Sequence, residues 1–172
     1  LYLEDWSSGM RDSRDYLFTM MDELVKLPIK RFLLPDTLGI LNPLQCVEYM
    51  RQMVRRYPNS HFDFHAHNDY DLAVSNSLAA VLSGAKGLHV TVNGLGERCG
   101  NAPLASVQVI LKDMFEAKTN IKEDRLNDIS RLVEGYSGIA VAPNTPVVGD
   151  NVFTQVAGVH ADGDNKDKLY CN

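Results

Sequence analysis

The chain has 172 residues, of which 45% are hydrophobic, and it carries a formal net charge of −5 with a pI near 5.5. This length and apolar content allow a buried core, which excludes disordered and peptide-like classes. An acidic chain offers no basic surface for nucleic acid or anionic lipid. No apolar run approaches the roughly 20 residues that cross a bilayer, and the N-terminus lacks the order of a signal peptide. We therefore expect a cytoplasmic protein with no nucleic-acid or membrane partner.

Short apolar runs alternate with helical patterns along most of the chain. Four runs, each followed by polar residues, predict strands at residues 1–3, 31–34, 61–64 and 88–92. Apolar residues spaced three and four apart predict helices at about 14–26, 43–56, 71–83 and 103–116. Pro43 behind Asn42 fits a helix start, and Gly84 fits a helix end. Alternating strands and helices imply parallel strands joined by right-handed crossovers.

Polar residues gather at the carboxyl ends of these strands, as they do in a (β/α)8 barrel. Only four strand–helix units are present, whereas a closed barrel has eight and about 250 residues. The chain also opens on a strand without an initiator Met. We therefore expect an α/β fold in which residues 1–118 are the second half of a TIM barrel. The alternative is an open four-unit sheet that folds alone, and it would expose two parallel edges.

Beyond the last expected barrel helix, the pattern changes. Residues 122–135 carry apolar side chains at helical spacing. Pro143 and Pro146 push their predecessors out of the helical region and indicate an extended or turn element. We expect residues 119–172 to form a linker and a small subdomain.

The segment His65-Ala66-His67 stands at the end of the third apolar run. In a strand, side chains two residues apart leave the same face, so both imidazoles can reach one metal ion. The pattern alone is more typical of a surface strand with two solvated histidines. A glycine-rich loop, Gly94–Asn101, follows next in the chain and favours the metal site.

Three widely spaced cysteines, Cys46, Cys99 and Cys171, form no CxxC pair. An odd number at such spacing is typical of reduced thiols in a cytosolic protein. Cys99 lies within the glycine-rich loop, where a small filler residue is a simpler interpretation than a catalytic thiol.

Five motifs follow one another in the chain. They are Glu4-Asp5, Pro35-Asp36-Thr37-Leu38-Gly39, His65-Ala66-His67-Asn68-Asp69, Asn93-Gly94-Leu95-Gly96-Glu97-Arg98-Cys99-Gly100-Asn101, and Gly158-Val159-His160-Ala161-Asp162-Gly163 with Tyr170. Their order resembles the 2-isopropylmalate synthase and citramalate synthase family. The resemblance covers essentially the whole chain, as strands five to eight of the barrel and the first subdomain after it. It implies a Claisen-type condensation of acetyl-CoA with a 2-oxo acid at a divalent metal in the barrel mouth.

The resemblance implies that His65 and His67 are ligands of the metal and that Asn101 is a ligand or a close neighbour. A 2-oxo acid can chelate a cation through its keto oxygen and one carboxylate oxygen, and the cation then acts as a Lewis acid. The family also uses an Asp from the first barrel strand, which this sequence does not include. Neutral imidazoles with oxygen ligands suit Zn, Mn or Co, and Mg also fits. Without the resemblance, Asn101 is an ordinary turn residue.

Four further residues take their roles from the same resemblance. Thr37 would donate its hydroxyl to the substrate carboxylate, and without the resemblance it is a helix cap. Glu4 would exchange protons near the reacting carbons, and its alternative is an exposed strand-end carboxylate. His160 would assist removal of a proton from the acetyl methyl group, and Tyr170 would hydrogen-bond to His160 or to the thioester. In relatives the partner subunit supplies this cover, which implies a homodimer with a shared site and a segment that is inactive alone.

The implied enzyme is an acyltransferase of branched-chain amino-acid biosynthesis. Its 2-oxo acid would be 2-oxoisovalerate, giving 2-isopropylmalate, or pyruvate, giving citramalate. Asp71 stands where isopropylmalate-forming relatives commonly have Gly and is typical of the citramalate-like branch, although an acidic residue also suits a helix start. A metal-dependent aldolase or acyl-CoA lyase on the same barrel is a second interpretation, which predicts a cysteine-bearing glycine loop in place of GERxGN and no GVHADG segment, so two features of this sequence count against it. The third is a non-catalytic half-barrel interaction protein without a metal.

Overall fold

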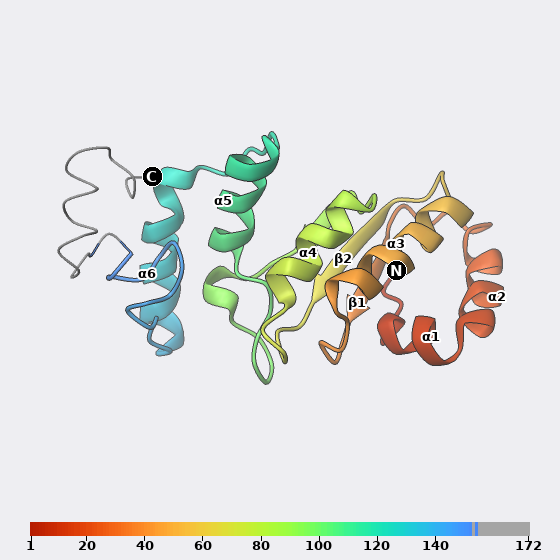
Figure 1. Cartoon of the computed structure of the whole chain (residues 1–172), viewed down its shortest axis with the longest axis horizontal. Coiled ribbons are helices and arrows are strands. Elements are labelled where there is room, and N and C mark those ends of the chain that lie inside the picture. The colour runs from red at the N-terminus through yellow and green to blue at the C-terminus, as the bar shows by residue number, and fades with distance from the viewer. Residues whose placement is uncertain (153, 155–172) are drawn as a thin grey trace. The chain divides into compact units, whose positions relative to one another are not determined.

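The computed structural model describes residues 1–152 and 154. Two compact units make up the chain: the first spans Leu1–Ile121, and the second begins at Lys122. Figure 1 shows the elements of each unit. Within the described residues, no helix is long and apolar enough to cross a membrane.

A three-stranded parallel sheet in the order β1-β2-β3 is the centre of the first unit (Figure 1). Its strands are β1 Phe32–Asp36, β2 Phe62–Ala66 and β3 Gly87–His89. The register places Asp63 beside Gly87. The first apolar run contributes an isolated parallel bridge, Tyr2 with Leu33, beside β1. The predicted parallel α/β fold is confirmed, and the four strand positions follow one another in space as they do in the chain.

Helices precede and follow the strands in chain order. They are α1 Trp6–Asp12, α2 Arg14–Leu24, α3 Pro43–Arg56, α4 Ala73–Leu82 and α5 Leu104–Phe115, with a 3-10 turn η1 Val92–Gly94. Helix α3 begins and ends where the spacing predicts. A capping box closes its start, because Asn42 accepts from the Gln45 amide and the Gln45 side chain accepts from the Asn42 amide. Gly84 follows α4 at φ +109°, as a helix end requires.

The sequence pattern does not predict α1. The helix is short and contains Gly9, which weakens the local preference for a helix. Packing decides instead, since Trp6 lies edge-on to both Tyr49 and Phe64, at 6.3 Å between ring centroids in each case. A Cβ on Gly9 would lie 2.9 Å from Leu17 Cδ1, so the glycine lets α1 and α2 approach each other closely.

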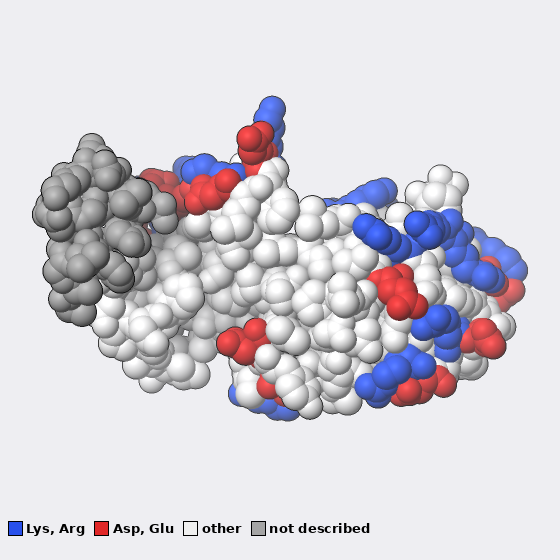
Figure 2. All heavy atoms as spheres, in the orientation of Figure 1, with Lys and Arg blue, Asp and Glu red and all other residues white. Residues whose placement is uncertain are grey.

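The core of the first unit lies between the sheet and the helices. Among its largest fully buried side chains are Trp6, Phe62, Phe64, Met10, Met21 and Leu34. Charged side chains lie interspersed over the end formed by α1–α3, whereas the face over α4 is largely uncharged (Figure 2). Two ion pairs join α3 to α2: Arg56 with Asp22 at 2.7 Å and Arg14 with Glu48 at 3.9 Å.

The second unit contains the 3-10 turn η2 Glu123–Arg125 and the helix α6 Leu126–Ser137. These two elements cover the helix that the spacing predicts at residues 122–135. Gly138 ends the helix at φ +69°. Glu134 then accepts the Val141 amide at 2.7 Å, which turns the following chain back toward the end of α6.

Candidate active site

Loops that follow the strands meet at the carboxyl edge of the sheet. An isolated bridge between His67 and Asn101 folds the glycine-rich loop against the end of β2. The Asn68 amide adds a hydrogen bond to the Gly100 carbonyl at 2.9 Å. Several non-glycine residues in these loops have a positive φ, which places their backbone in the left-handed region. They are Asp5, Asp71, Asn93 and Arg98. Strained backbone conformations of this kind gather at functional sites.

His65 and His67 bring their Nε2 atoms to 3.3 Å from each other, with ring planes at 81°. Two nitrogens that each lie about 2.1 Å from one tetrahedral ion are about 3.4 Å apart, so this pair is spaced for a shared cation. Burial is the largest cause that lowers the pKa of His65, and the nearby imidazoles of His67 and His89 lower it further. A lowered pKa keeps the imidazole neutral at neutral pH, which is the form that binds metal.

The donor set at this pair fits a borderline divalent cation. The Nδ1 atoms of both histidines are buried and have no hydrogen-bond partner among the described residues. Metal-bound imidazoles ordinarily donate their second N–H to a partner. Among the described residues, no three His, Cys, Asp or Glu side chains are grouped so that they could hold a metal ion together. The two imidazoles offer two of the four ligands that a tetrahedral cation takes.

The Asn101 side chain lies beside the histidines with 5% of the residue exposed. Its Nδ2 lies 3.3 Å from His65 Nε2 and donates to the Ala66 carbonyl at 3.2 Å. Gly96 leaves room for the amide oxygen, because a Cβ there would overlap Asn101 Oδ1. A carboxamide binds a cation through oxygen, so ligation by Asn101 requires the opposite amide orientation. The structure brings Asn101 to the site, and its role as a ligand stays a prediction.

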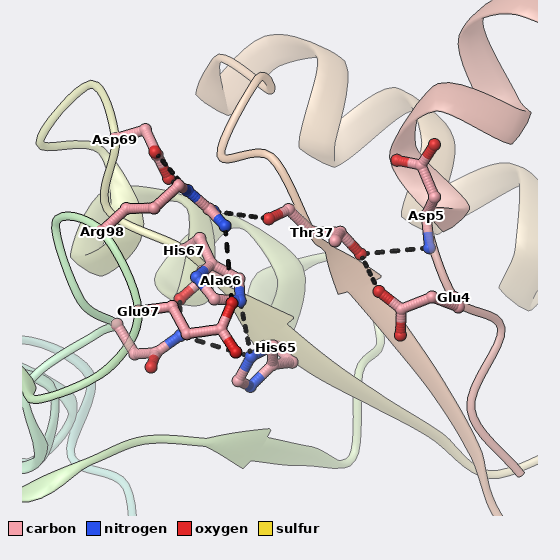
Figure 3. A network of polar contacts seen from close by, with 10 residues as sticks. Glu4, Asp5, Thr37, His65, Ala66, His67, Asp69, Glu97 and Arg98 are labelled. Atoms are coloured by element: carbon pink, nitrogen blue, oxygen red, sulfur yellow. Dashed lines mark hydrogen bonds and ion pairs between the residues drawn. The ribbon is translucent and has the colours of Figure 1, made fainter.

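Thr37 and Glu4 form a second polar group, which joins the end of β1 to the first apolar run (Figure 3). The Thr37 hydroxyl donates to Glu4 Oε1 at 2.8 Å and accepts the Asp5 amide at 3.0 Å. Thr37 is not the cap of the following helix, since Asn42 caps α3. The buried carboxylate of Asp36, whose pKa is raised by burial, accepts two amides of the intervening loop and holds its shape.

The structure also shows an ion pair between Arg98 and Asp69. The sequence motifs alone assign no role to either residue. Arg98 donates from Nε and Nη2 to the two carboxylate oxygens at 2.7 and 2.9 Å, and from Nη2 to the Thr37 carbonyl at 2.7 Å (Figure 3). The hydrogen bonds from Arg98 lower the pKa of the Asp69 carboxyl. Opposite charges in two strand-end motifs are the sequence signal for this pair, but residue spacing does not show which charges meet.

A ladder of rings runs from the histidines across the sheet. His89 of β3 lies edge-on to His65, and Tyr2 lies edge-on to His89, each at 5.9 Å between ring centroids. The Tyr2 hydroxyl lies 3.3 Å from His89 Nδ1. Because these two residues come from the first and last of the four strand positions, their contact passes over β1 and β2.

Two predicted site residues, His160 and Tyr170, lie outside the described residues, as does Cys171. Cys46 and Cys99 are both free thiols, the first buried and the second exposed. The structure therefore brings together His65 with His67 and Asn101, and separately Thr37 with Glu4.

Comparisons with known proteins follow the motifs. The HMGL-like family model matches residues 6–133. A probable 2-isopropylmalate synthase and a putative (R)-citramalate synthase of Methanopyrus kandleri are 40% and 39% identical over 153 and 163 residues. A homocitrate synthase of Saccharolobus islandicus is 44% identical over 155 residues. These alignments cover 89%, 93% and 90% of this chain and 30%, 32% and 33% of the relatives, so the chain spans about a third of their length. The names confirm the resemblance seen in the motifs.

Solved structures share the fold. An HMG-CoA lyase of Acinetobacter baumannii, in complex with coenzyme A and 3-methylmalate, has a TM-score of 0.63 and 28% identity, and covers 73% of this chain and 43% of that chain. The HMG-CoA lyase of Bacillus subtilis has a TM-score of 0.69 and 22% identity over 82% of this chain and 48% of that chain. With the parallel strand order, these matches confirm that the chain covers part of a TIM barrel.

Proposed function

The chain belongs to the HMGL-like family, and from this premise we propose that it is part of an acyltransferase that joins acetyl-CoA to a 2-oxo acid. Support comes from relatives named as synthases of 2-isopropylmalate, citramalate and homocitrate. The observation that carries the proposal is the pair of imidazoles, with Nε2 atoms 3.3 Å apart, at the strand end next to the hydrogen-bonded Thr37 and Glu4.

In this proposal His65 and His67 hold a divalent cation, with Asn101 as a ligand or close neighbour. The cation supplies Lewis-acid polarisation of the keto group when it is bound. Zn, Mn, Co and Mg are all compatible with these donors. Pyruvate and 2-oxoisovalerate are the proposed 2-oxo acids, in branched-chain amino-acid biosynthesis, and the homocitrate synthase relative adds 2-oxoglutarate.

Condensation requires a proton to leave the acetyl methyl group. That carbon then bonds to C2 of the 2-oxo acid, the C2 carbonyl opens to an alkoxide, and the alkoxide takes up a proton. Water then cleaves the thioester and releases CoA. Thr37 would donate its hydroxyl to the substrate carboxylate, and a hydroxyl has one proton to donate. Substrate binding would therefore replace the hydrogen bond to Glu4 and leave that carboxylate available for proton exchange near the reacting carbons.

His160 and Tyr170 are proposed to reach the site from the partner subunit of a homodimer. Support is the Gly158–Gly163 motif that the resemblance includes. An imidazole that titrates near neutrality suits proton removal from the acetyl methyl group, and the Tyr170 hydroxyl can hydrogen-bond to His160 or to the thioester.

The test uses the full-length protein, loaded in turn with Zn, Mn, Co or Mg. Acetyl-CoA is mixed with pyruvate, 2-oxoisovalerate or 2-oxoglutarate, released CoA is measured as free thiol, and mass spectrometry identifies the product. We expect CoA release with one of the three acids and its loss after chelation of the metal. No CoA release with any acid and any metal rejects the proposal.

An acyl-CoA lyase is the second candidate, favoured by the HMG-CoA lyase that matches at 28% identity. The intact GERxGN pattern, in which Cys99 occupies the variable position, and the GVHADG segment count against it. A lyase would cleave 3-hydroxy-3-methylglutaryl-CoA to acetyl-CoA and acetoacetate, without any 2-oxo acid. Incubation of the full-length protein with that thioester therefore separates the two candidates.

A further inference from the structure

Arg98 joins loops from three strand ends through one guanidinium (Figure 3). Nε and Nη2 hold both oxygens of Asp69, in the motif that contains His67, and Nη2 also holds the Thr37 carbonyl. We call Arg98, Asp69 and Thr37 the Arg98 clamp. A planar guanidinium fixes this fork of hydrogen bonds, whereas a Lys ammonium does not.

The backbone conformations at Arg98 and Gly39 allow the contacts of the Arg98 clamp. Arg98 has φ +54°, a conformation that a long side chain rarely adopts. Gly39 has φ +60°, and a Cβ there would lie 2.9 Å from Asp69 Oδ2 and 3.1 Å from the His67 carbonyl. The glycine therefore lets the loop after β1 pack directly against the carboxylate. The left-handed backbone at Arg98 and the close packing at Gly39 both lie at the ion pair between Arg98 and Asp69.

The contacts continue from the clamp to the proposed proton-exchanging group. Thr37, held by its carbonyl, donates its hydroxyl to Glu4 and accepts the Asp5 amide. Asp5 is itself left-handed at φ +55°. One line of contacts thus runs from Asp69 through Arg98 and Thr37 to Glu4, across segments that are distant in sequence.

We propose that Arg98 is a positioning residue, which fixes Thr37 so that its hydroxyl donates to Glu4 in the free enzyme and to the 2-oxo acid once that substrate binds. This inference rests on the proposed condensation, because that reaction gives Thr37 and Glu4 their roles. Its structural part is independent of the reaction: the guanidinium orders the Glu4–Asp5 backbone through Thr37.

Arg56 supplies a matched control. It donates from Nη2 and Nε to the two oxygens of Asp22 at 2.7 and 3.3 Å, on α3 and α2. Both arginine side chains are partly exposed, 38% for Arg98 and 49% for Arg56. Replacing either one removes a surface ion pair, so a difference between the two variants does not come from charge pairing in general.

Hydrogen exchange of the Asp5 amide in the full-length protein tests the structural part. Arg98→Ala and Asp69→Asn should each speed this exchange about tenfold, because the Thr37 hydroxyl no longer stays at the amide. Arg56→Ala should leave it unchanged. Unchanged exchange in the Arg98 variant, or an equal rise in Arg56→Ala, overturns the proposal. If Arg98→Ala does not fold, Arg98→Lys replaces it, since lysine keeps the charge and loses the fork.

Steady-state kinetics test the catalytic part. Arg98→Ala and Arg98→Lys should raise KM for the 2-oxo acid and lower kcat, each about tenfold, with KM for acetyl-CoA and metal content unchanged. An equal rise in both KM values, or full activity of Arg98→Lys, contradicts the positioning role. Wild-type protein that releases no CoA rejects the proposed function, and exchange of the Asp5 amide still decides whether Arg98 orders the loop.

Discussion

Removal of either imidazole from the His65 and His67 pair should empty the proposed metal site. Alanine at either position leaves one nitrogen donor of the two, so we expect both full-length variants to lose tight metal binding and CoA release together. His61 is a matched control, because it lies just before β2 and its Nε2 pairs with Asp63 at 2.8 Å instead. His61→Ala should keep its metal. Metal content after gel filtration checks this, and a full metal load in His67→Ala would remove the assignment.

The two described cysteines should differ sharply in reactivity. Burial raises the pKa of Cys46 to about 12, and its Sγ donates to the Asn76 carbonyl at 3.3 Å. Because the thiolate is the reactive form, Cys46 should resist iodoacetamide at about pH 8 while the exposed Cys99 is alkylated. Peptide mass spectrometry measures both sites, and denatured protein, in which both react, is the control. Faster alkylation of Cys46 than of Cys99 would contradict the structure.

Residue types at the candidate site could be predicted from the sequence, but several of their contacts could not. His65 and His67 share a face by local strand geometry, which any extended segment has. Arg98 meets Asp69 across 29 positions in the chain, through a loop whose left-handed backbone no spacing reveals. The amide of Asn101 is oriented by the Ala66 carbonyl, a backbone group that no side-chain pattern encodes.

The capping box of α3 gives a prediction for a whole element. Asn42→Ala removes the acceptor for the Gln45 amide and should lower the free energy of unfolding by about 1 kcal/mol. Ser13→Ala is the control, because Ser13 precedes α2 and makes no side-chain hydrogen bond to the start of that helix, while its hydroxyl donates at 3.4 Å to the Gly9 carbonyl of α1. Urea unfolding of the full-length variants, followed by circular dichroism, compares the two midpoints. Equal midpoints for Asn42→Ala and Ser13→Ala would show that the box contributes nothing.

Elements with a clear period or a clear cap could be predicted, and the others depended on their neighbours. The expected strands at 31–34 and 61–64 extend to Asp36 and Ala66, because pairing between them sets their ends. The expected strand at 88–92 ends at His89, where the chain soon turns into η1. Helix α1 forms because Trp6 packs into the core, a contact that lies outside any local window.

A shared site makes a prediction for the assembled protein. His160→Ala and His67→Ala should each be inactive, yet co-assembled variants should regain part of the CoA release. The reason is that a mixed dimer with sites shared between subunits contains one site with both histidines intact. Sites formed within one subunit would each carry a defect. Differently tagged subunits allow mixed dimers to be isolated and checked, and mixed dimers that release no CoA would reject the shared site.

The contact between Tyr2 and His89 limits what a closed barrel can contain. These rings already meet over the width of β1 and β2, and an eight-stranded barrel has an interior just wide enough for side chains to fill. Inward side chains come in layers, each supplied by alternate strands. Because two side chains cannot occupy one volume, any side chain that faces His89 from across a closed barrel has to pack beside these two rings and not in the place that they fill.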